Sequence, residues 1–172
     1  YSDDVEKYKK LGLLPPHTEN WKSPMLNGYA ANKVVFAGKV PENAAQWQDA
    51  LARLNAALGT ERQGDMHILV APASKINNPD SYLNAVLAYW QGRDFGKSAL
   101  GKNGIVVVVG LNQNGSRVQW VRSKTGMPTG NGEMTTALNI ISDVSSDPYK
   151  LIGNTNSRWD GKEIKYTLSG GT

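Results

Sequence analysis

The 172-residue sequence predicts an α/β fold in which a mixed, mostly parallel sheet lies between two layers of helices. Segments with the period of strands alternate with segments that have the period of helices, a pattern typical of parallel crossovers. The run at residues 105–109 is β-branched and uninterrupted, which indicates a central strand covered on both faces. Asn114-Gly115 then predicts a turn, so residues 105–122 should form a β-hairpin with an antiparallel second strand.

The first 33 residues predict a lead-in of irregular or helical structure, and residues 34–172 predict a single α/β domain. The lead-in is polar and contains Pro15-Pro16, which favours an irregular path over most of its length. Three apolar residues nevertheless have helical spacing and indicate one short helix. They are Val5, Tyr8 and Leu11.

Five short segments of the domain predict strands. The first three are expected to be parallel, because helical segments separate them along the chain. Pro72 ends the second strand, since proline has no backbone N–H to donate. The strand segments are residues 34–37, 66–71, 105–110, 117–122 and 164–168.

Three segments repeat apolar residues on one helical face. Pro41 suits the first turn of the first helix, and Gly59 is expected to end that helix. Asp80 or Ser81 is expected to cap the second helix with a side-chain oxygen, and Gly92 is expected to end it. The three apolar faces are Trp47, Leu51, Leu54 and Leu58; Leu83, Val86, Leu87 and Trp90; and Met134, Leu138 and Ile141 within residues 134–144.

Composition and charge exclude several classes of site and partner. The chain contains no cysteine, which excludes disulfides, thiol nucleophiles and cysteine-bound metals. Its net charge of +4 is dispersed over 19 basic and 15 acidic residues. Nucleic-acid-binding domains concentrate such charge on one face, so we expect no nucleic-acid partner.

The ends of the chain bear on its location. It begins at Tyr1 and finishes with Ser-Gly-Gly-Thr, and both ends have the character of cuts. No segment approaches the roughly 18 apolar residues of a membrane span, so we expect no transmembrane segment in this chain. We expect an extracytoplasmic location in the periplasm, a lumen or the cell exterior, with anchoring by a segment outside this sequence.

Residues 92–98 (GRDFGKS) look like a phosphate-binding P-loop but do not fit one. The P-loop has four residues between its first glycine and its Gly-Lys pair, and it joins a strand to a following helix. Here only three residues intervene, and a helix precedes the loop. The negative end of the helix dipole therefore faces the loop, and we expect no nucleotide cofactor.

Two carboxylates in glycine-containing loops are candidate ligands of a divalent cation. Glu133 follows threonines, glycines and an asparagine whose oxygens suit Ca²⁺ or Mg²⁺, and Asp94 lies in the basic loop. A glutamate just before a helix also serves as a partner of the helix dipole, so both interpretations stay open. His17 and His67 are isolated in the sequence, and His67 is expected to have a structural role in its strand.

Several segments resemble the TPM domain, a family that includes thylakoid lumen proteins linked to photosystem repair and many bacterial exported proteins. The resemblance covers residues 34–145. Residues 36–58 look like the first strand and helix of the family, and residues 118–141 resemble its second hairpin strand, glycine loop and next helix. Between them lie Trp90-x-Gly92, a loop ending in Asn103-Gly104, and the strand IVVVV. The resemblance implies an α/β sandwich, divalent-cation binding and, for some members, acid phosphatase activity.

Two departures from the family pattern weaken the expected cation site. Val35 stands where the family usually has an Asp just before its first Ala-Gly, and Gly130-Asn131-Gly132-Glu133 replaces a Gly-Leu-Glu signature. Loss of a carboxylate weakens a calcium site that depends on ligand charge. It also disfavours phosphatase chemistry, which needs metal or cationic groups on the phosphoryl oxygens.

The sequence leaves two functions open. The favoured prediction is a non-catalytic TPM-like interaction module that binds a protein partner in an exported or membrane-associated assembly. Trp120 and Arg122 on the hairpin are then the predicted partner contacts. The alternative is a metal-dependent acid phosphatase in which Glu133 and Asp94 lie near the cation.

Overall fold

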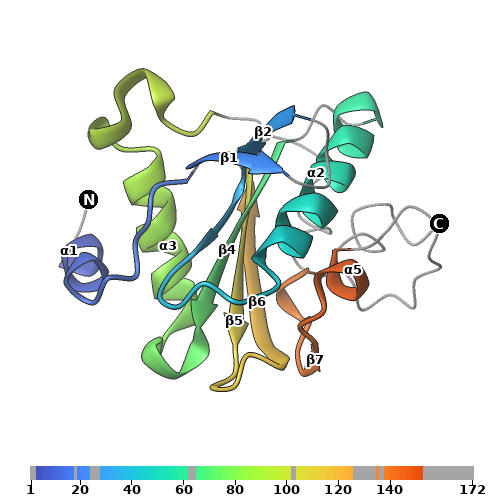
Figure 1. Ribbon diagram of the computed structural model, residues 1–172. Coiled ribbons are helices and arrows are strands. Elements are labelled where there is room, and N and C mark those ends of the chain that lie inside the picture. The colour runs from blue at the N-terminus through green and yellow to red at the C-terminus, as the bar shows by residue number, and fades with distance from the viewer. Residues whose placement is uncertain are drawn as a thin grey trace.

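The computed structural model describes residues 3–17, 19–23, 28–61, 65–101, 104–125, 135 and 138–152 (Figure 1). For residues 3, 19–23, 28–32, 56–61, 65, 93, 97 and 98 it describes the backbone alone. The elements are α1 Asp3–Lys10, β1 Glu19–Ser23, β2 Gly28–Asn32, β3 Val34–Phe36, α2 Ala44–Glu61, β4 Asp65–Pro72, η1 Ala73–Lys75, α3 Pro79–Trp90, η2 Arg93–Ser98, β5 Gly104–Leu111, β6 Arg117–Thr125, β7 Val144–Ser145 and α5 Pro148–Leu151.

The main sheet is mixed, which confirms the α/β class. Its described strands follow the order β3-β4-β5-β6-β7. The first three strands are parallel, and β6 and β7 are antiparallel to their neighbours. The sheet is therefore partly parallel rather than mostly parallel. The predicted hairpin is confirmed as β5–β6, in which Val108 pairs with Arg122.

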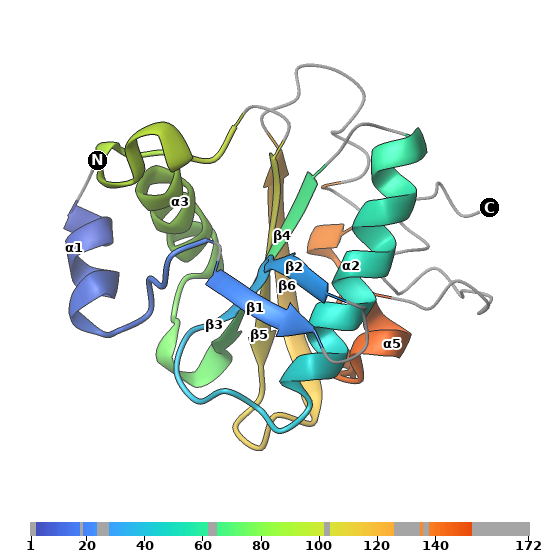
Figure 2. The same cartoon turned by 45° about the horizontal axis from the view of Figure 1, so that its top comes forward.

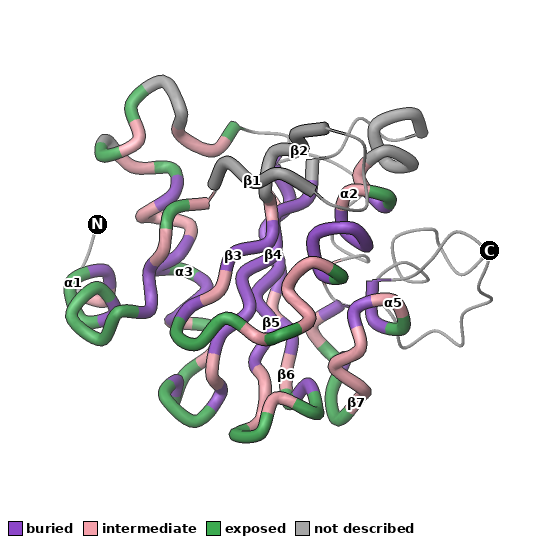
Figure 3. Tube along the Cα trace, in the orientation of Figure 1, coloured by how far each residue is buried: buried purple, intermediate pink, exposed green. Residues whose placement is uncertain are grey.

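The side chains of β4 and β5 alternate between two hydrophobic cores. One core lies between the sheet and α2, and it contains Met66, Ile68, Ile105, Val107 and Val109 from these strands. The other lies on the α3 side of the sheet, and Leu69, Ala71, Val106 and Val108 belong to it. Figure 3 shows the resulting continuous burial along these central strands.

Helices α2 and α3 join consecutive parallel strands but cover opposite faces of the sheet (Figures 1 and 2). The strands β3, β4 and β5 are neighbours in chain order and run in the same direction. Two crossovers that advance in the same direction over opposite faces must have opposite hands. One of them is therefore left-handed, which is the rare hand for a β-α-β unit.

The lead-in contains more regular structure than the sequence predicted. α1 is the expected short helix, with Val5 and Tyr8 buried, although Leu11 beyond its end is exposed. β1 and β2 pair antiparallel where an irregular path was predicted. The sequences of these strands, ENWKS and GYAAN, contain no β-branched residue. Each contains one aromatic residue that favours strands, so strand propensity gave only a weak signal for this pair.

The cap of α3 also differs from the prediction. Asn78, rather than Asp80 or Ser81, is the N-cap, and its side chain accepts a hydrogen bond from the Ser81 backbone N–H at 3.1 Å. Pro79 occupies the first turn, where its missing N–H needs no partner. The cap therefore lies before the proline, and Asp80 is left available to pair with another part of the chain.

Two predicted helix ends are wrong. α2 begins at Ala44, after a turn that follows Pro41, and continues through Gly59 to Glu61. A glycine inside a helix costs only about 1 kcal/mol, which burial of the apolar face offsets. Val144 lies in β7 rather than in a helix that extends over residues 134–144. The strand predicted at 164–168 lies outside the described residues.

Within the described residues, no helix is both long enough and apolar enough to cross a membrane. Trp47 and Trp90 lie in the two cores, as their positions on the apolar helical faces predicted. His67 is also buried, on the α3 side of β4. The predicted apolar faces of these two helices therefore place Trp47 and Trp90 correctly in the cores.

Gly110 lies where the hairpin β5–β6 packs most closely. Trp120 is its partner across the hairpin, and the indole fills the space that a Cβ at Gly110 would occupy. The strand register also shifts between Gly110 and Leu111, as in a β-bulge. The close approach of the indole therefore requires a residue without a side chain at this position.

Gly110→Ala is expected to lower the free energy of unfolding by about 1–3 kcal/mol, because the new methyl group would overlap the Trp120 indole. Urea unfolding followed by far-UV circular dichroism measures the change. Gly101→Ala is the control, since a Cβ at Gly101 meets no atom within 4 Å. Equal unfolding midpoints for the two variants would contradict the close packing.

Candidate functional site

A cleft of about 600 Å³ lies at the carboxyl ends of the three parallel strands. β3, β4 and β5 all finish at this edge, and ligands of open α/β sheets usually bind outside such ends. The described lining residues are Ala37, Lys39, Pro41, Glu42, Asn43, Val70, Ala71, Pro72, Leu111, Asn112, Gln113, Asn114 and Gly115.

Two connections form the walls of the cleft. One is the segment between β3 and α2, where Gly38 has a φ of +96° that side-chain-bearing residues rarely adopt. The other is the β5–β6 turn, in which Asn112 Oδ1 accepts a hydrogen bond from the Arg117 N–H at 3.1 Å. Asn114 Oδ1 accepts a hydrogen bond from the Ser116 N–H at 3.0 Å. Both asparagines thus hold the turn that carries Gln113.

The side chains at the mouth of the cleft differ in charge and character. Lys39, Glu42 and Gln113 are exposed, whereas Val70 and Leu111 supply apolar surface. Glu42 is the single carboxylate among the described lining residues. This set offers hydrogen bonds and one charge of each sign to a ligand. A single carboxylate supplies little of the negative charge that strengthens a Ca²⁺ site.

Val35 faces away from α2. Its side chain is 2% exposed and lies in the core on the α3 side of the sheet. Within the described part of the chain, no group of three or more His, Asp or Glu residues could hold a metal ion.

The predicted cation ligands are not brought together by the described structure. Asp94 lies in η2, after the C-terminal end of α3, at the end of the sheet opposite the cleft (Figure 1). Its carboxylate forms an ion pair with the Lys9 ammonium at 3.4 Å. Glu133 lies outside the described residues. A role of Asp94 and Glu133 in metal binding stays a prediction.

The predicted partner contacts, Trp120 and Arg122, both have partners within the molecule. Trp120 is half-buried against the core on the α3 side and covers Gly110. The Arg122 guanidinium pairs with Asp80 at 3.0 Å and donates to the Asn139 carbonyl at 3.3 Å. These contacts tie β6 to neighbouring segments, so both residues have a structural role.

The sequence analysis missed the cleft residues Lys39, Glu42 and Gln113. A signal was present, because the predicted parallel strands ended just before residues 38–43 and 112–116. The rule that ligands bind beyond the carboxyl ends of parallel strands would have selected these two segments. The predicted ligands Asp94 and Glu133 were instead selected as carboxylates in glycine-containing loops.

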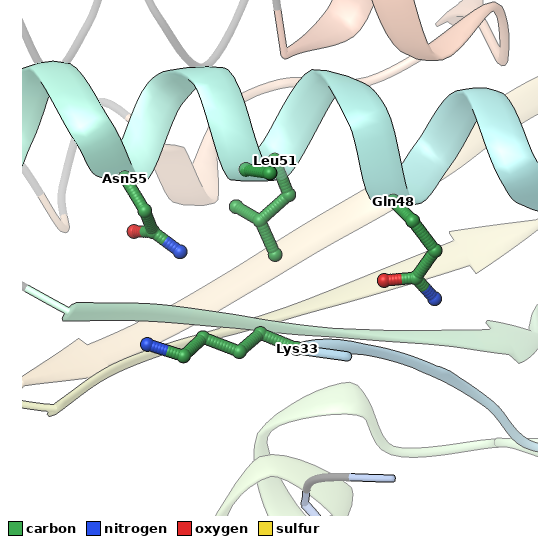
Figure 4. A pocket seen from close by; sticks show the side chains of 5 residues that line it. Lys33, Gln48, Leu51 and Asn55 are labelled. Carbon is green, nitrogen blue, oxygen red and sulfur yellow. The ribbon is translucent and has the colours of Figure 1, made fainter. Parts of the chain in front are cut away.

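A second, smaller cavity of about 160 Å³ lies between α2 and the edge of the sheet (Figure 4). The amide side chains that line it already form hydrogen bonds with backbone groups. Gln48 Nε2 donates to the Val34 carbonyl at 2.6 Å, and Asn55 accepts from the Met66 N–H at 2.9 Å. This cavity therefore lies beside contacts that complete the strand edges, and we assign it no ligand.

Asp49 lies on α2, and its buried carboxylate faces α5. Its Oδ2 accepts hydrogen bonds from the Tyr149 hydroxyl at 2.6 Å and from Arg53 Nε at 3.0 Å. Its Oδ1 has no hydrogen-bond partner within the described part of the chain. Burial, followed by the hydrogen bond to Asp49, raises the pKa of Tyr149 to about 12. This contact fastens α5 to α2.

The stabilising effect of Tyr149 is expected to disappear between pH 10 and pH 12. Folding raises its pKa from 10.0 to about 12, so its contribution is complete below pH 10 and is lost as pH rises through 12. Urea unfolding of the wild type and Tyr149→Phe at pH 8, 10 and 11.5 gives the difference in unfolding free energy. A difference that stays constant over this range would contradict the prediction.

Comparison with known proteins supplies no relative for this chain. No protein-family model matches it, and no curated protein matches it.

Proposed function

We propose that the chain is a non-catalytic, TPM-like interaction module that binds a protein partner through the cleft at the carboxyl edge of its sheet. The observation that carries this proposal is the cleft itself, which lies where open α/β sheets bind ligands. A volume of about 600 Å³ can accommodate several residues of a bound chain. The mouth carries exposed Lys39, Glu42 and Gln113, which can contact that chain.

The chemistry of the described lining residues favours binding over catalysis. Apolar surface from Val70 and Leu111 lies beside amide groups, and peptide ligands use both kinds of contact. One lysine and one glutamate cannot by themselves supply the clamps that phosphoryl transfer requires. The internal contacts of Trp120 and Arg122 make the cleft mouth the preferred place for partner contacts.

The TPM resemblance completes the proposal. It adds an α/β sandwich of the family type and an exported or membrane-associated setting, in which this module would belong to a larger assembly. Helices on both faces of the sheet are compatible with that architecture. A divalent cation remains part of the proposal through Glu133, although Val35 has replaced the family's Asp in the first strand.

A photoreactive amino acid at Gln113 is expected to form a discrete adduct with the partner in an extract of the source cells. Gln113 is exposed at the mouth of the cleft, so a bound chain would lie beside it. The same amino acid at Asn84, an exposed position on α3, is the control. Denaturing gel electrophoresis and mass spectrometry identify the adducts. Identical adducts from both positions would exclude the cleft as the specific contact.

The phosphatase alternative makes a different prediction. If the proposed function is correct, hydrolysis of a generic phosphomonoester stays at background with Ca²⁺, Mg²⁺ or EDTA, and Glu133→Gln changes nothing. Thermal melts in the same solutions test cation binding separately. A ligand at 100 times its dissociation constant stabilises the folded state by about 2.7 kcal/mol. Chelator-sensitive hydrolysis that Glu133→Gln abolishes would establish the phosphatase instead.

A further inference from the structure

Residues 13–17, which we call the strap, are held to the domain through their backbone carbonyls. The Tyr82 hydroxyl donates to the Leu13 carbonyl at 2.7 Å, and Trp90 Nε1 donates to the Pro15 carbonyl at 2.8 Å. His67 Nδ1 lies 3.3 Å from the His17 carbonyl. A carbonyl can only accept, so this third contact requires the proton on Nδ1 of His67.

The three accepting carbonyls occur at alternate positions of the strap. All three meet side-chain donors of the domain, so the strap presents these backbone carbonyls to it. The donors come from α3 and β4 and belong to side chains, not to a neighbouring strand. Recognition of this kind depends on the extended backbone of the bound segment. It is the chemistry of a docked peptide.

The side chains of the strap add apolar and aromatic contacts. Leu13 and Leu14 are buried in the core on the α3 side. The His17 ring lies 5.1 Å from Phe95, 5.4 Å from His67 and 5.9 Å from Trp90, measured between ring centroids. Pro16, in contrast, is exposed. We call Tyr82, Trp90, His67 and Phe95 together the aromatic surface.

α1 brings the strap to this surface. Gly12, with a φ of +70°, turns the chain after α1, and the Leu13 N–H donates to the Tyr8 carbonyl at 3.0 Å. The Tyr8–Tyr82 ring contact at 5.1 Å attaches α1 to the first turn of α3, and the Lys9–Asp94 ion pair attaches it to η2. Figures 1 and 2 both show this segment alongside α3.

We propose that the aromatic surface is a peptide-binding site whose ligand is the strap, and that it also accepts the strap of a second copy of this chain. Exchange would keep the contacts that join residues 8–17 to α3, η2 and β4. The two arrangements would differ in the connection from His17 to β3, which includes the β1–β2 pair. Such exchange of an identical element is an economical route to a dimer.

The test uses the full chain with a protease site inserted after Thr18 and cleaved in the folded protein. A fluorescent peptide of residues 1–17 should replace the cleaved segment, with a saturable rise in anisotropy. Exchange should be faster than global unfolding, since a docked peptide leaves by local opening. Exchange only at the rate of global unfolding would show that the strap is an ordinary part of the core and would overturn the proposal.

Matched variants test the contacts. Trp90→Phe keeps the ring but loses the donor to the Pro15 carbonyl, so peptide affinity should fall about five-fold. A His17→Ala peptide should weaken by a similar factor of about five, because it loses the ring contacts. A Pro16→Ala peptide should bind unchanged, since Pro16 is exposed. The assigned site would be overturned if the Trp90→Phe domain and both peptide variants all gave the wild-type affinity.

The second-copy ligand needs its own measurement. An intact chain carrying Trp90→Phe holds its own strap less tightly and should donate it to a cleaved chain. Size-exclusion chromatography with light scattering should then detect a complex of one intact and one cleaved chain, and excess free peptide should dissolve it. Peptide binding without this complex would overturn the proposed exchange between copies.

Discussion

Burial of β5 on both faces is the constraint on which the other layers depend. Ile105, Val107 and Val109 point towards α2, while Val106 and Val108 point towards α3. A strand with no polar face can be stable only if helices or other segments cover both sides. β4 and β6 satisfy its backbone groups, and the helical layers exclude water from its side chains. Both cores are thus needed to bury the two faces of this one strand.

Amide side chains complete the backbone hydrogen bonding where this sheet has no neighbouring strand. Gln48 pairs with both backbone groups of Val34, and Asn55 pairs with both groups of Met66. Near the opposite edge of the sheet, Asn139 Oδ1 accepts a hydrogen bond from the Ser123 N–H at 2.7 Å. An exposed strand edge can template pairing with another chain. These amides stabilise the edges and make such pairing less favourable.

The same architecture accounts for the two surfaces that we propose for binding. Parallel β3, β4 and β5 must end at one edge, and the segments that follow them leave the cleft between their connections. The α3 face is covered in part by the strap, a segment without strand or helix structure. Side-chain donors hold it there. A surface covered by a separate short segment can exchange that segment, whereas a continuous helix layer cannot do so at low cost.

Local patterns were sufficient where burial and chemistry acted on nearby residues. The apolar run of β5, the Asn-Gly turn, and the helical faces around Trp47 and Trp90 all depend on spacing within one element. They predicted the α/β class, the hairpin, and the burial of Trp47 and Trp90 in the cores. The β1–β2 pair was missed because each of its strands has only one residue that favours strands, and pairing with a partner strand compensates for this.

The sequence by itself determined the class of fold, the central strand and the composition of the two helical faces, because these follow from periodicity and burial. Only the tertiary structure decided that α2 and α3 lie on opposite faces, that Arg122 pairs with Asp80, and that the strap carbonyls meet side-chain donors. Those contacts join residues tens of positions apart. Their partners are selected by how the layers pack, and local spacing contains no information about that choice.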